Sequence, residues 1–373
     1  MPITRIETLS NDCFNRDRLG YGDIFDEEKY SHYILDDKDL LMSHINSRTF
    51  LGRTVLYRKR NGEKIIHGMN VLRIKTNQDI LDPIFAFYLF RTSLFKRHID
   101  NIRKDAINQS SFALSDLKNI ELYIPTIKEQ NKIAYTLQLL DSKISLNRQI
   151  NDNLEAMAKQ LYDYWFVQFD FPNEEGKPYK SSGGAMMWND KLKREIPQGW
   201  STLPISAILD KYPTTKRYET KEYLSQGKYP IIDQGDTYIV GYTNEDDNLL
   251  TRHPAVLFGD HSTKVKFLDF DFARGADGTQ ILYSSNDAVS QYYLYLAVST
   301  LQIPNPGYSR HFKYLKELPI VIPSLSIAIK FANIAKPLFK KWTNNIFNNI
   351  ALTKQRDELL PLLMNGQASV NSD

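Results

Sequence analysis

Cysteine is almost absent from this sequence, since Cys13 is the only one among 373 residues. A single cysteine excludes an internal disulfide and a cysteine-based zinc site. The sequence has no run of 18 apolar residues and no signal-peptide pattern, so we expect a cytoplasmic chain with no membrane contact. Its net charge of +3 is small, so any surface for a polyanion must be a local patch.

Motifs for catalysis and metal binding are missing as well. The seven histidines show no metal-ligand spacing, and there is no Gly-x-x-x-x-Gly-Lys phosphate loop. The segment Asp82-Pro83-Ile84-Phe85 is partly similar to the Asp-Pro-Pro-Tyr box of amino-methyltransferases. A helix start explains it better, because proline is favoured in a first helical turn. Gly259-Asp260-His261 is predicted as a turn. We therefore predict a non-catalytic chain that holds no cofactor and no metal.

The most informative feature of the sequence is an internal repeat. Residues 127–165 predict one long helix whose seam positions recur in alternating steps of four and three, as in a heptad. Sliding the sequence by 198 residues lays Ile124-Pro125 on Ile322-Pro323 and continues without a gap. The seam positions are Ile133, Leu137, Leu140, Ile144, Asn147, Asn151, Leu154, Ala158, Leu161 and Trp165, then Phe331, Ala335, Leu338, Trp342, Asn345, Asn349, Leu352 and Leu359. The chain is therefore predicted to be a duplication.

A seam of this kind needs a partner helix, and the second copy is the obvious one. If the two helices run antiparallel, Asn147 lies opposite Asn349 and Asn151 opposite Asn345, so that one register pairs both polar layers. The alternative is that these asparagines lie at a frayed or wet edge. Pro337 predicts a kink or restart near Lys336, and the second helix is expected to end near Leu360.

Each long helix follows a globular segment. We predict segments at 1–123 and 201–321, long helices at 124–165 and 322–373, and a linker without compact structure at 166–200. Expected strands lie at 39–43, 50–57, 64–75, 117–124, 229–232, 237–242, 255–258, 265–268, 280–283 and 318–322, with helices at 80–99 and 287–300. The fold class is α+β, with two similar globular domains and two long antiparallel coiled-coil helices.

Clusters of basic and amide residues recur at comparable places in the two globular segments. Arginine and lysine can neutralise phosphates, while arginine, asparagine, glutamine and serine can also contact base edges. Each cluster by itself is more typical of a solvated surface, and the recurrence in two copies is what favours nucleic-acid binding. The candidate DNA-binding residues are Arg48, Arg53, Gln109 and Ser110 in the first segment and Lys264, Arg274, Tyr308 and Arg310 in the second.

Over nearly its whole length the sequence resembles the specificity (S) subunits of Type I restriction-modification systems. The most specific matches are Ile124-Pro-Thr-Ile-Lys-Glu-Gln-Asn-Lys-Ile133, Trp165-Phe-Val-Gln-Phe-Asp170 with Gly176-Lys-Pro-Tyr179, and Ile196-Pro-Gln-Gly-Trp200. The order of variable domain, long helix, variable domain and long helix is also that of the family. One departure is the stretch before Asp39, which is shorter than the one before Ala255. It leads us to expect a first domain that is trimmed or lacks an opening strand.

The resemblance implies two target-recognition domains, each reading one half of a split, asymmetric site on double-stranded DNA, with the helical pair setting the gap. Two modification subunits would dock along the helices and carry the methyl donor. Restriction subunits would join for ATP-driven translocation and cleavage. Two alternatives remain open at this stage, a helical-pair scaffold that binds only proteins and a stand-alone DNA-modifying enzyme.

Overall fold

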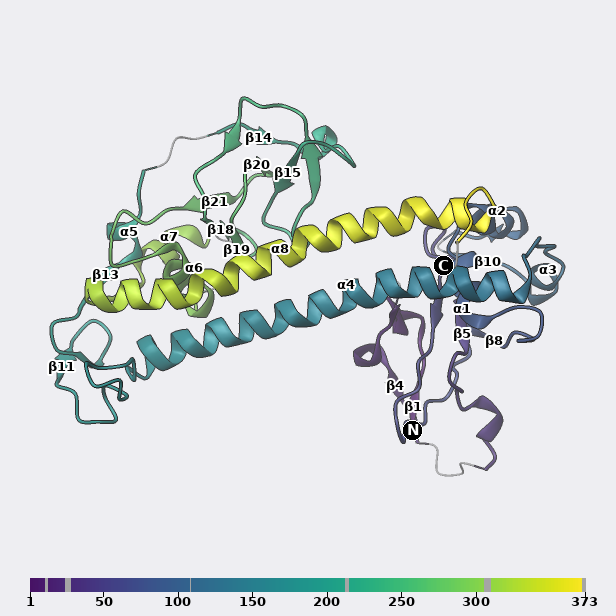
Figure 1. Cartoon of the computed structure of the whole chain (residues 1–373), viewed down its shortest axis with the longest axis horizontal. Helices are drawn as coiled ribbons and strands as arrows, with labels where there is room; N and C mark the ends of the chain where they lie inside the picture. The colour runs from purple at the N-terminus through teal and green to yellow at the C-terminus, as the bar shows by residue number, and fades with distance from the viewer. Residues whose placement is uncertain (11–12, 24–27, 108, 212–214, 305–309, 371–373) are drawn as a thin grey trace. The chain divides into compact units, whose positions relative to one another are not determined.

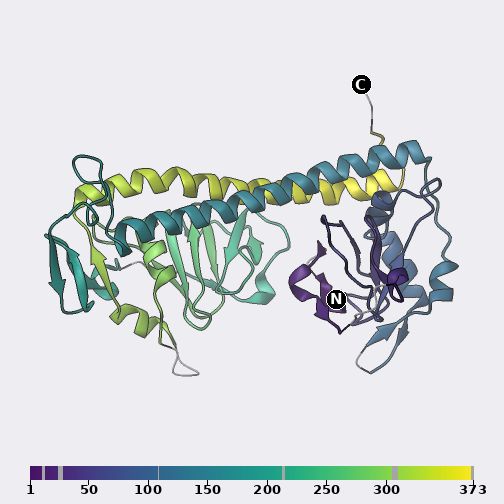
Figure 2. The same cartoon turned by 90° about the horizontal axis from the view of Figure 1, so that it is seen from below.

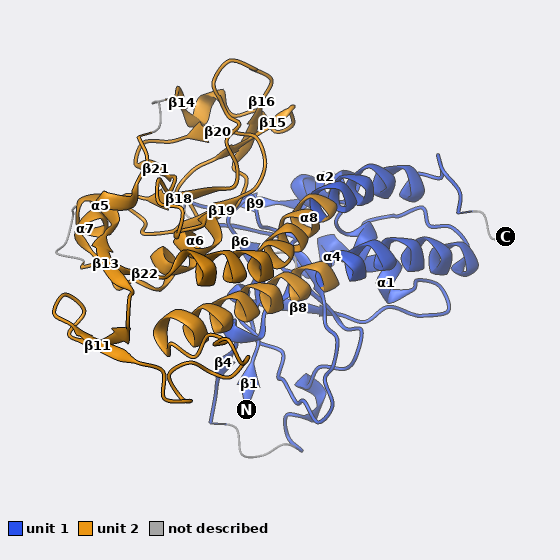
Figure 3. Cartoon of the chain, turned by 60° about the vertical axis from the view of Figure 1, so that its left-hand side comes forward, with its two compact units in different colours: residues 1–145, 349–373 blue, residues 146–348 orange. Residues whose placement is uncertain are grey.

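The computed structural model of the chain describes residues 1–10, 13–23, 28–107, 109–211, 215–304 and 310–370. It forms two compact units, of which unit 1 comprises Met1–Ser145 with Asn349–Asp373 and unit 2 comprises Leu146–Asn348 (Figure 3). Each unit combines an α+β globular part with one portion of each long helix. The predicted fold class, α+β with two long helices, is confirmed.

The two long helices are α4 (Ile127–Tyr162) and α8 (Leu325–Met364), and they lie side by side in both Figure 1 and Figure 2. Helix α4 begins with a reciprocal cap, in which the Thr126 backbone N–H donates to Glu129 Oε2 at 3.1 Å and the Glu129 N–H donates to Thr126 Oγ1 at 3.4 Å. It continues into a π-helical turn at Asp163–Val167.

The prediction of a restart near Lys336 is wrong, because α8 is continuous through Pro337 and ends at Met364 rather than near Leu360. A proline inside a helix removes one backbone hydrogen bond and costs about 3 kcal/mol. On either side of it, Phe331, Ala335 and Phe339 are buried in the core of unit 2, which offsets that cost. Pro337 itself is exposed.

Cross-helix contacts show that α4 and α8 are antiparallel, since partners move backward along α8 as they move forward along α4. In unit 1 Arg356 Nη1 donates to Asp141 Oδ1 at 2.7 Å, and Asn349 Nδ2 donates to the Ile144 carbonyl at 3.3 Å. In unit 2 Asn345 Nδ2 donates to Asn151 Oδ1 at 2.9 Å, and Asn151 Nδ2 donates to the Trp342 carbonyl at 3.1 Å.

The main sheet of unit 1 has the order β7-β5-β8, with β5 (Leu40–Ser43) antiparallel to β7 (Thr54–Leu56) and β8 (Val71–Ile74). All three strands are shorter than the predicted ranges 39–43, 50–57 and 64–75. Smaller pairings join β1 (Pro2–Ile3) to β4 (Gly20–Tyr21), β2 (Leu9–Ser10) to β3 (Cys13–Phe14), and β10 (Ser110–Ser111) to both β6 (Ile45–Asn46) and β9 (Lys104–Asp105). Short 3-10 helices lie at Ile6–Thr8, Arg16–Arg18 and Ser31–Tyr33.

The helix expected at 80–99 is two helices, α1 (Pro83–Leu89) and α2 (Ser93–Ile102). Thr92 begins the second one, because its Oγ1 accepts the Phe95 backbone N–H at 3.2 Å. The strand expected at 117–124 is wrong. A short helix α3 (Leu114–Lys118) lies there, and no strand is formed at 119–124 in the described chain. A strand needs a neighbour, and none pairs with this segment in unit 1.

The globular part of unit 2 has two main sheets. One has the order β19-β18-β21, with β18 (Ala255–Gly259) between β19 (Val265–Leu268) and β21 (Thr279–Leu282). In the other, β20 (Phe272–Gly275) is parallel to β14 (Arg217–Tyr218) and β15 (Tyr229–Ile232) and antiparallel to β17 (Leu249–Leu250). Strand β16 (Gly241–Thr243) extends this sheet by pairing with β15. The predicted strands at 229–232 and 265–268 match β15 and β19 residue for residue.

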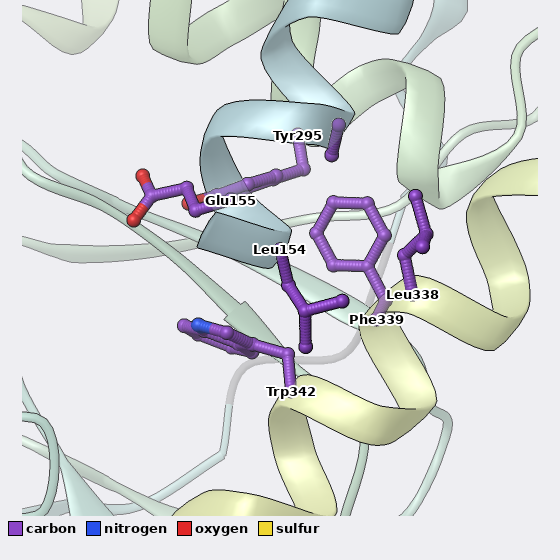
Figure 4. A pocket seen from close by; sticks show the side chains of 7 residues that line it. Leu154, Glu155, Tyr295, Leu338, Phe339 and Trp342 are labelled. Carbon is purple, nitrogen blue, oxygen red and sulfur yellow. The ribbon is translucent and has the colours of Figure 1, made fainter. Parts of the chain in front are cut away.

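Shorter elements complete unit 2. Strand β13 (Ser201–Pro204) pairs with β22 (Pro319–Ile322), the pairing that has no counterpart at 119–124 of unit 1. The helices are α5 (Ile205–Ile208), α6 (Gln291–Thr300) and α7 (Phe312–Glu317), with a 3-10 helix at Thr220–Glu222. Figure 4 shows how the long helices meet α6, with Leu154 of α4 pointing toward Phe339 and Trp342 of α8 and Tyr295 of α6 beside them.

The prediction that residues 166–200 lack compact structure is wrong. Strands β11 (Met186–Asn189) and β12 (Arg194–Pro197) form a hairpin, and Phe171 stacks on Trp200 with ring centroids 4.8 Å apart. Phe166 is buried and meets Tyr293 at 4.6 Å and Phe331 at 4.8 Å. Of the residues that suggested a linker, Pro172 and Pro178 pair in a β-bridge, and Gly176 and Gly183 lie in the bend and the turn beside it.

Candidate nucleic-acid interface

Three loops of unit 2 meet at the side chain of Gln234. Its Oε1 accepts the backbone N–H of His261 at 3.0 Å, and its Nε2 donates to the Asp277 carbonyl at 2.7 Å. Its backbone carbonyl accepts the Ser262 hydroxyl at 2.7 Å. The Gln234 residue therefore joins the loops 233–237, 260–264 and 276–278, which contain the predicted residue Lys264 and follow the strand that carries Arg274.

Two lysines belong to this loop cluster and differ in their surroundings. Lys264 is exposed and forms an ion pair with Asp236 at 2.8 Å, which holds the pKa of that carboxyl below its usual value. Lys266 is buried, and its Nζ donates to the carbonyls of Asp233 at 2.8 Å and Thr237 at 2.7 Å. Burial lowers the pKa of Lys266. Lys266 therefore stabilises the loop 233–237 through buried hydrogen bonds, whereas the Lys264 side chain is exposed to solvent.

Arg274 and Arg217 are register partners on the parallel strands β20 and β14. Arg274 is only 7% exposed, and its Nε has no hydrogen-bond partner among the described residues. Burial lowers the pKa of Arg274, the neighbouring Arg217 lowers it further, and Asp277 opposes both effects. Arg217 is ion-paired with Asp277, and Arg310 Nη2 lies 3.9 Å from the other carboxylate oxygen. The predicted residue Tyr308 lies outside the described residues.

In unit 1 the pairing of β6 with β10 joins the two predicted regions, because Asn46 and Ser110 are register partners. Arg48 is exposed on the turn after β6, and its backbone carbonyl accepts a hydrogen bond from Lys96 Nζ at 3.1 Å. Gln109 is exposed beside β10. The structure thus places Arg48, Gln109 and Ser110 in neighbouring segments of one surface.

Two of the predicted residues of unit 1 have clear structural contacts. Ser110 is buried, and its hydroxyl donates to Asp105 Oδ1 at 2.6 Å. Hydrogen bonds from Arg103 and then Ser110 lower the pKa of Asp105. The Arg53 guanidinium lies 4.1 Å from the centroid of the Phe50 ring, and its Nη1 donates to the Leu9 carbonyl at 3.4 Å. Ser110 therefore stabilises the pairing of β10 with β9, and the Arg53 guanidinium packs against the Phe50 ring.

The sequence patterns did not indicate Gln234 or Lys266, and they indicated Asp277 only as a member of the cluster 274–278, with no role of its own. Gln234 and Asp277 each lie next to a turn glycine, Gly235 and Gly278, which marks a loop but does not reveal its partners. The contacts of Gln234 join residues 27 to 43 positions apart, which no local pattern encodes. No group of three or more possible metal ligands occurs in the described part of the chain, and none of its helices is long and apolar enough to cross a membrane.

These observations define a class of protein. It has two α+β units, each of which includes part of an antiparallel pair of long helices, and each unit has basic loops. Residues 1–156 match the model of the "Type I restriction modification DNA specificity domain". The chain is 36% identical over 208 residues to the putative type I restriction enzyme MjaX specificity subunit of Methanocaldococcus jannaschii, covering 55% of this chain and 45% of that protein. It is 27% identical over 313 residues to the MjaIX specificity subunit of the same organism, covering 77% and 69%.

Among solved structures, the S subunit of a Type I restriction-modification system from M. genitalium shares the fold, with a TM-score of 0.55 and 18% identity over 90% of this chain and 84% of that one. Residues 1–156 thus match the family's specificity domain, and the chain is similar in sequence to specificity (S) subunits of Type I restriction-modification systems. This likeness agrees with the sequence prediction of a non-catalytic specificity subunit. The chain spans less than half the length of the first relative named above.

Proposed function

We propose that this chain recognises double-stranded DNA for a Type I restriction-modification complex, with each unit reading one half of a bipartite, asymmetric site. The observation that carries this proposal is the repeated placement of basic loops on two similar α+β units, in a chain similar to specificity subunits. The two globular segments differ in sequence, so the two half-sites should differ as well. The long helices would set the gap between them.

The residues proposed to contact DNA are Arg48, Arg53 and Gln109 in unit 1 and Lys264, Arg274, Tyr308 and Arg310 in unit 2. Arg48, Gln109, Lys264 and Arg310 are exposed, which suits contacts with phosphates or base edges. Ser110 is buried under the surface of unit 1, so we propose that it acts by holding β10 against β9 through its hydrogen bond to Asp105.

We propose target-recognition domains at 1–123 and 201–321, with the conserved helices at 124–165 and 322–373. Asn147, Asn151, Asn345 and Asn349 would fix the helix register, and the hydrogen bond between Asn151 and Asn345 supports that role. Residues 166–200, which belong to unit 2 and contribute to its hydrophobic core, would connect the first helix to the second domain.

Two modification subunits would dock along the long helices, and restriction subunits would join the assembly in the cytoplasm. Methyl donor and ATP would bind to those partners. In unit 2, a groove between the ends of the helices is lined by the partly exposed apolar residues Met157, Tyr164 and Ile334. In unit 1, Tyr135, Leu139 and Leu362 are exposed on the same two helices. Exposed apolar side chains on long helices support a role in binding other subunits.

Methylation mapping tests this proposal. The chain would be co-expressed with its neighbouring modification subunit in a host that lacks both, and the host DNA would be sequenced for modified bases. We expect a split motif with a fixed gap that disappears when the chain is omitted. If the complex forms but methylation does not depend on the chain, the DNA-reading role is refuted and a protein-binding scaffold is favoured.

A matched pair of variants tests the assignment to two half-sites. Arg48→Ala in unit 1 should relax or lose one half of the motif, and Lys264→Ala in unit 2 should affect the other half or the overall affinity. Replacing a base-reading arginine costs about 1–3 kcal/mol at one position. Identical methylation patterns in wild type and both variants would remove these residues from the interface.

A further inference from the structure

Two arginines of unit 2 form ion pairs with the Asp277 carboxylate, and a third, Arg274, is the register partner of one of them. Arg217 and Arg274 are neighbours on parallel strands, so their side chains leave the sheet on the same face. Arg310 reaches the same place from the segment before α7, with Nη2 at 3.9 Å from Asp277 Oδ2. Asp277 also forms the ion pair with Arg217. Three positive charges and one negative charge leave a local excess of two positive charges.

The turn that carries Asp277 is held firmly. Ala276 and Gly278 both have positive φ angles, at 35° and 81°. The Ala276 backbone N–H donates to the Tyr218 carbonyl and to the Tyr223 hydroxyl, each at 3.1 Å. A Cβ added at Gly278 would lie 2.6 Å from Gln234 Nε2, so the loops are in close contact there. These contacts therefore fix the backbone at Asp277, although its side chain is 67% exposed.

Arg274 supplies an independent observation. Its guanidinium is more than nine-tenths buried, yet its Nε has no hydrogen-bond partner among the described residues. A buried charged donor without a partner is costly, and such groups are found where a ligand or ion completes the hydrogen bonding. Planar guanidinium groups favour phosphate and carboxylate oxygens. The ligand indicated by this group is therefore an anion with several oxygens.

We propose that Arg217, Arg274 and Arg310 form a phosphate subsite of the DNA interface, in which the Asp277 carboxylate is an internal counterion that a DNA backbone phosphate displaces. This inference rests on the proposed function. In the free chain the carboxylate reduces the attraction of the subsite for any polyanion. A duplex docked in the correct register brings a phosphodiester, which has the same single negative charge as the carboxylate, and adds the attraction of its neighbouring phosphates. Asp277 would thus lower non-specific binding more than specific binding.

The test compares Asp277→Asn with a matched control. Asparagine keeps the size of the side chain and removes its charge. Asp246→Asn is the control, since Asp246 is similarly exposed at 62%, lies in the same unit and forms an ion pair with Lys228 away from the three arginines. Fluorescence anisotropy would measure the affinity of the full chain, co-purified with modification subunits, for a 30-base-pair duplex without its recognition motif, over a potassium chloride series.

We expect Asp277→Asn to bind this duplex at least about threefold more tightly at low salt, and the slope of log K against log salt to steepen by up to about 1. Asp246→Asn should match the wild type. Arg217→Gln should weaken binding and flatten the slope by about 1, and it should abolish the gain from Asp277→Asn when the two are combined. This second variant keeps the test informative if Asp277→Asn lowers the thermal stability.

The outcomes separate the two levels of inference. If the wild-type complex binds the motif-free duplex, and Asp277→Asn and Asp246→Asn bind it with equal affinity, the counterion assignment alone is overturned. Weaker binding of Asp277→Asn to the recognition motif, with the motif-free duplex unchanged, would also overturn it and would assign Asp277 to a base edge, such as the cytosine amino group. If the wild-type complex binds no duplex at all, the proposed function fails and this inference with it.

Discussion

The hydrogen-bonded pair Asn151 and Asn345 between α4 and α8 makes a quantitative prediction about the helix pair. Asn345 is fully buried and Asn151 is 9% exposed. Asn151 forms two hydrogen bonds across the helix pair, accepting from Asn345 and donating to the Trp342 carbonyl, whereas Asn345 forms one. The Oδ1 of Asn345 is buried without a partner among the described residues. The two residues should therefore respond differently to replacement by leucine.

The Asn151→Leu variant loses both contacts and leaves the amide of Asn345 unsatisfied, which should cost about 2–4 kcal/mol. Asn345→Leu loses one contact and also removes an unsatisfied oxygen, so it should cost about 1–2 kcal/mol. The double variant removes both buried side-chain amides and should lie within about 1 kcal/mol of the wild type, because replacing both partners by apolar groups of similar size is often neutral.

Urea unfolding of the full chain, followed by far-ultraviolet circular dichroism and by tryptophan fluorescence, would measure these differences. Asn333→Leu is the control, because Asn333 is an exposed asparagine on the same helix and should change stability by no more than about 0.5 kcal/mol. If the two single effects simply add in the double variant, or if Asn345→Leu costs more than Asn151→Leu, the reasoning from the hydrogen bonds is refuted.

Three further predictions concern α8, an ion pair of unit 1 and the loop cluster of unit 2. Pro337→Ala should raise the free energy of unfolding by about 1–3 kcal/mol, because alanine favours a helix that already continues through this exposed position. An unchanged free energy of unfolding, measured in urea, would contradict this prediction. The hydrogen bond from Arg16 holds the pKa of Glu63 at about 2, below its usual 4.5, so its stabilisation is present above pH 4.5 and is lost as the pH falls toward 2. Glu63→Gln should flatten the fall of unfolding free energy in that window, and an unchanged pH profile would argue against the ion pair. Gln234→Ala should weaken binding to the recognition motif about tenfold, or ~1.4 kcal/mol, by releasing three loops, as measured by anisotropy; wild-type affinity would show that the loops need no such support.

Periodic patterns were the most predictable part of this fold. The seam residues Ile133, Leu137 and Ile144 of α4 and Phe331 and Ala335 of α8 are buried as the heptad pattern requires. Strand β15 is a run of apolar and aromatic residues, and β19 is apolar apart from Lys266, so local sequence determines both well. These elements depend on side chains a few positions apart, which a single sequence displays directly.

Elements that depend on distant partners were not predictable. The segment 117–124 has the apolar character of β22, but only β22 has a partner strand, β13. Trp200 and Phe171 convert a glycine-rich and proline-rich stretch into a packed hairpin region. In the candidate interface, composition indicated the basic residues, while the roles of Gln234 and Asp277 arise from contacts across three loops.

The make-up of unit 1 from two distant stretches of chain has a consequence for synthesis on the ribosome. Unit 1 takes Met1–Ser145 from the start of the chain and Asn349–Asp373 from its end. Leu363 is buried in the same cluster as Leu137 and Phe85, and Arg356 satisfies Asp141. The residues of unit 1 that are translated first therefore keep an apolar helix face exposed until residues 349–364 have been synthesised. A premature stop codon after Asn348 would leave the sequence of unit 2 complete and would damage the unit encoded at the opposite end of the gene.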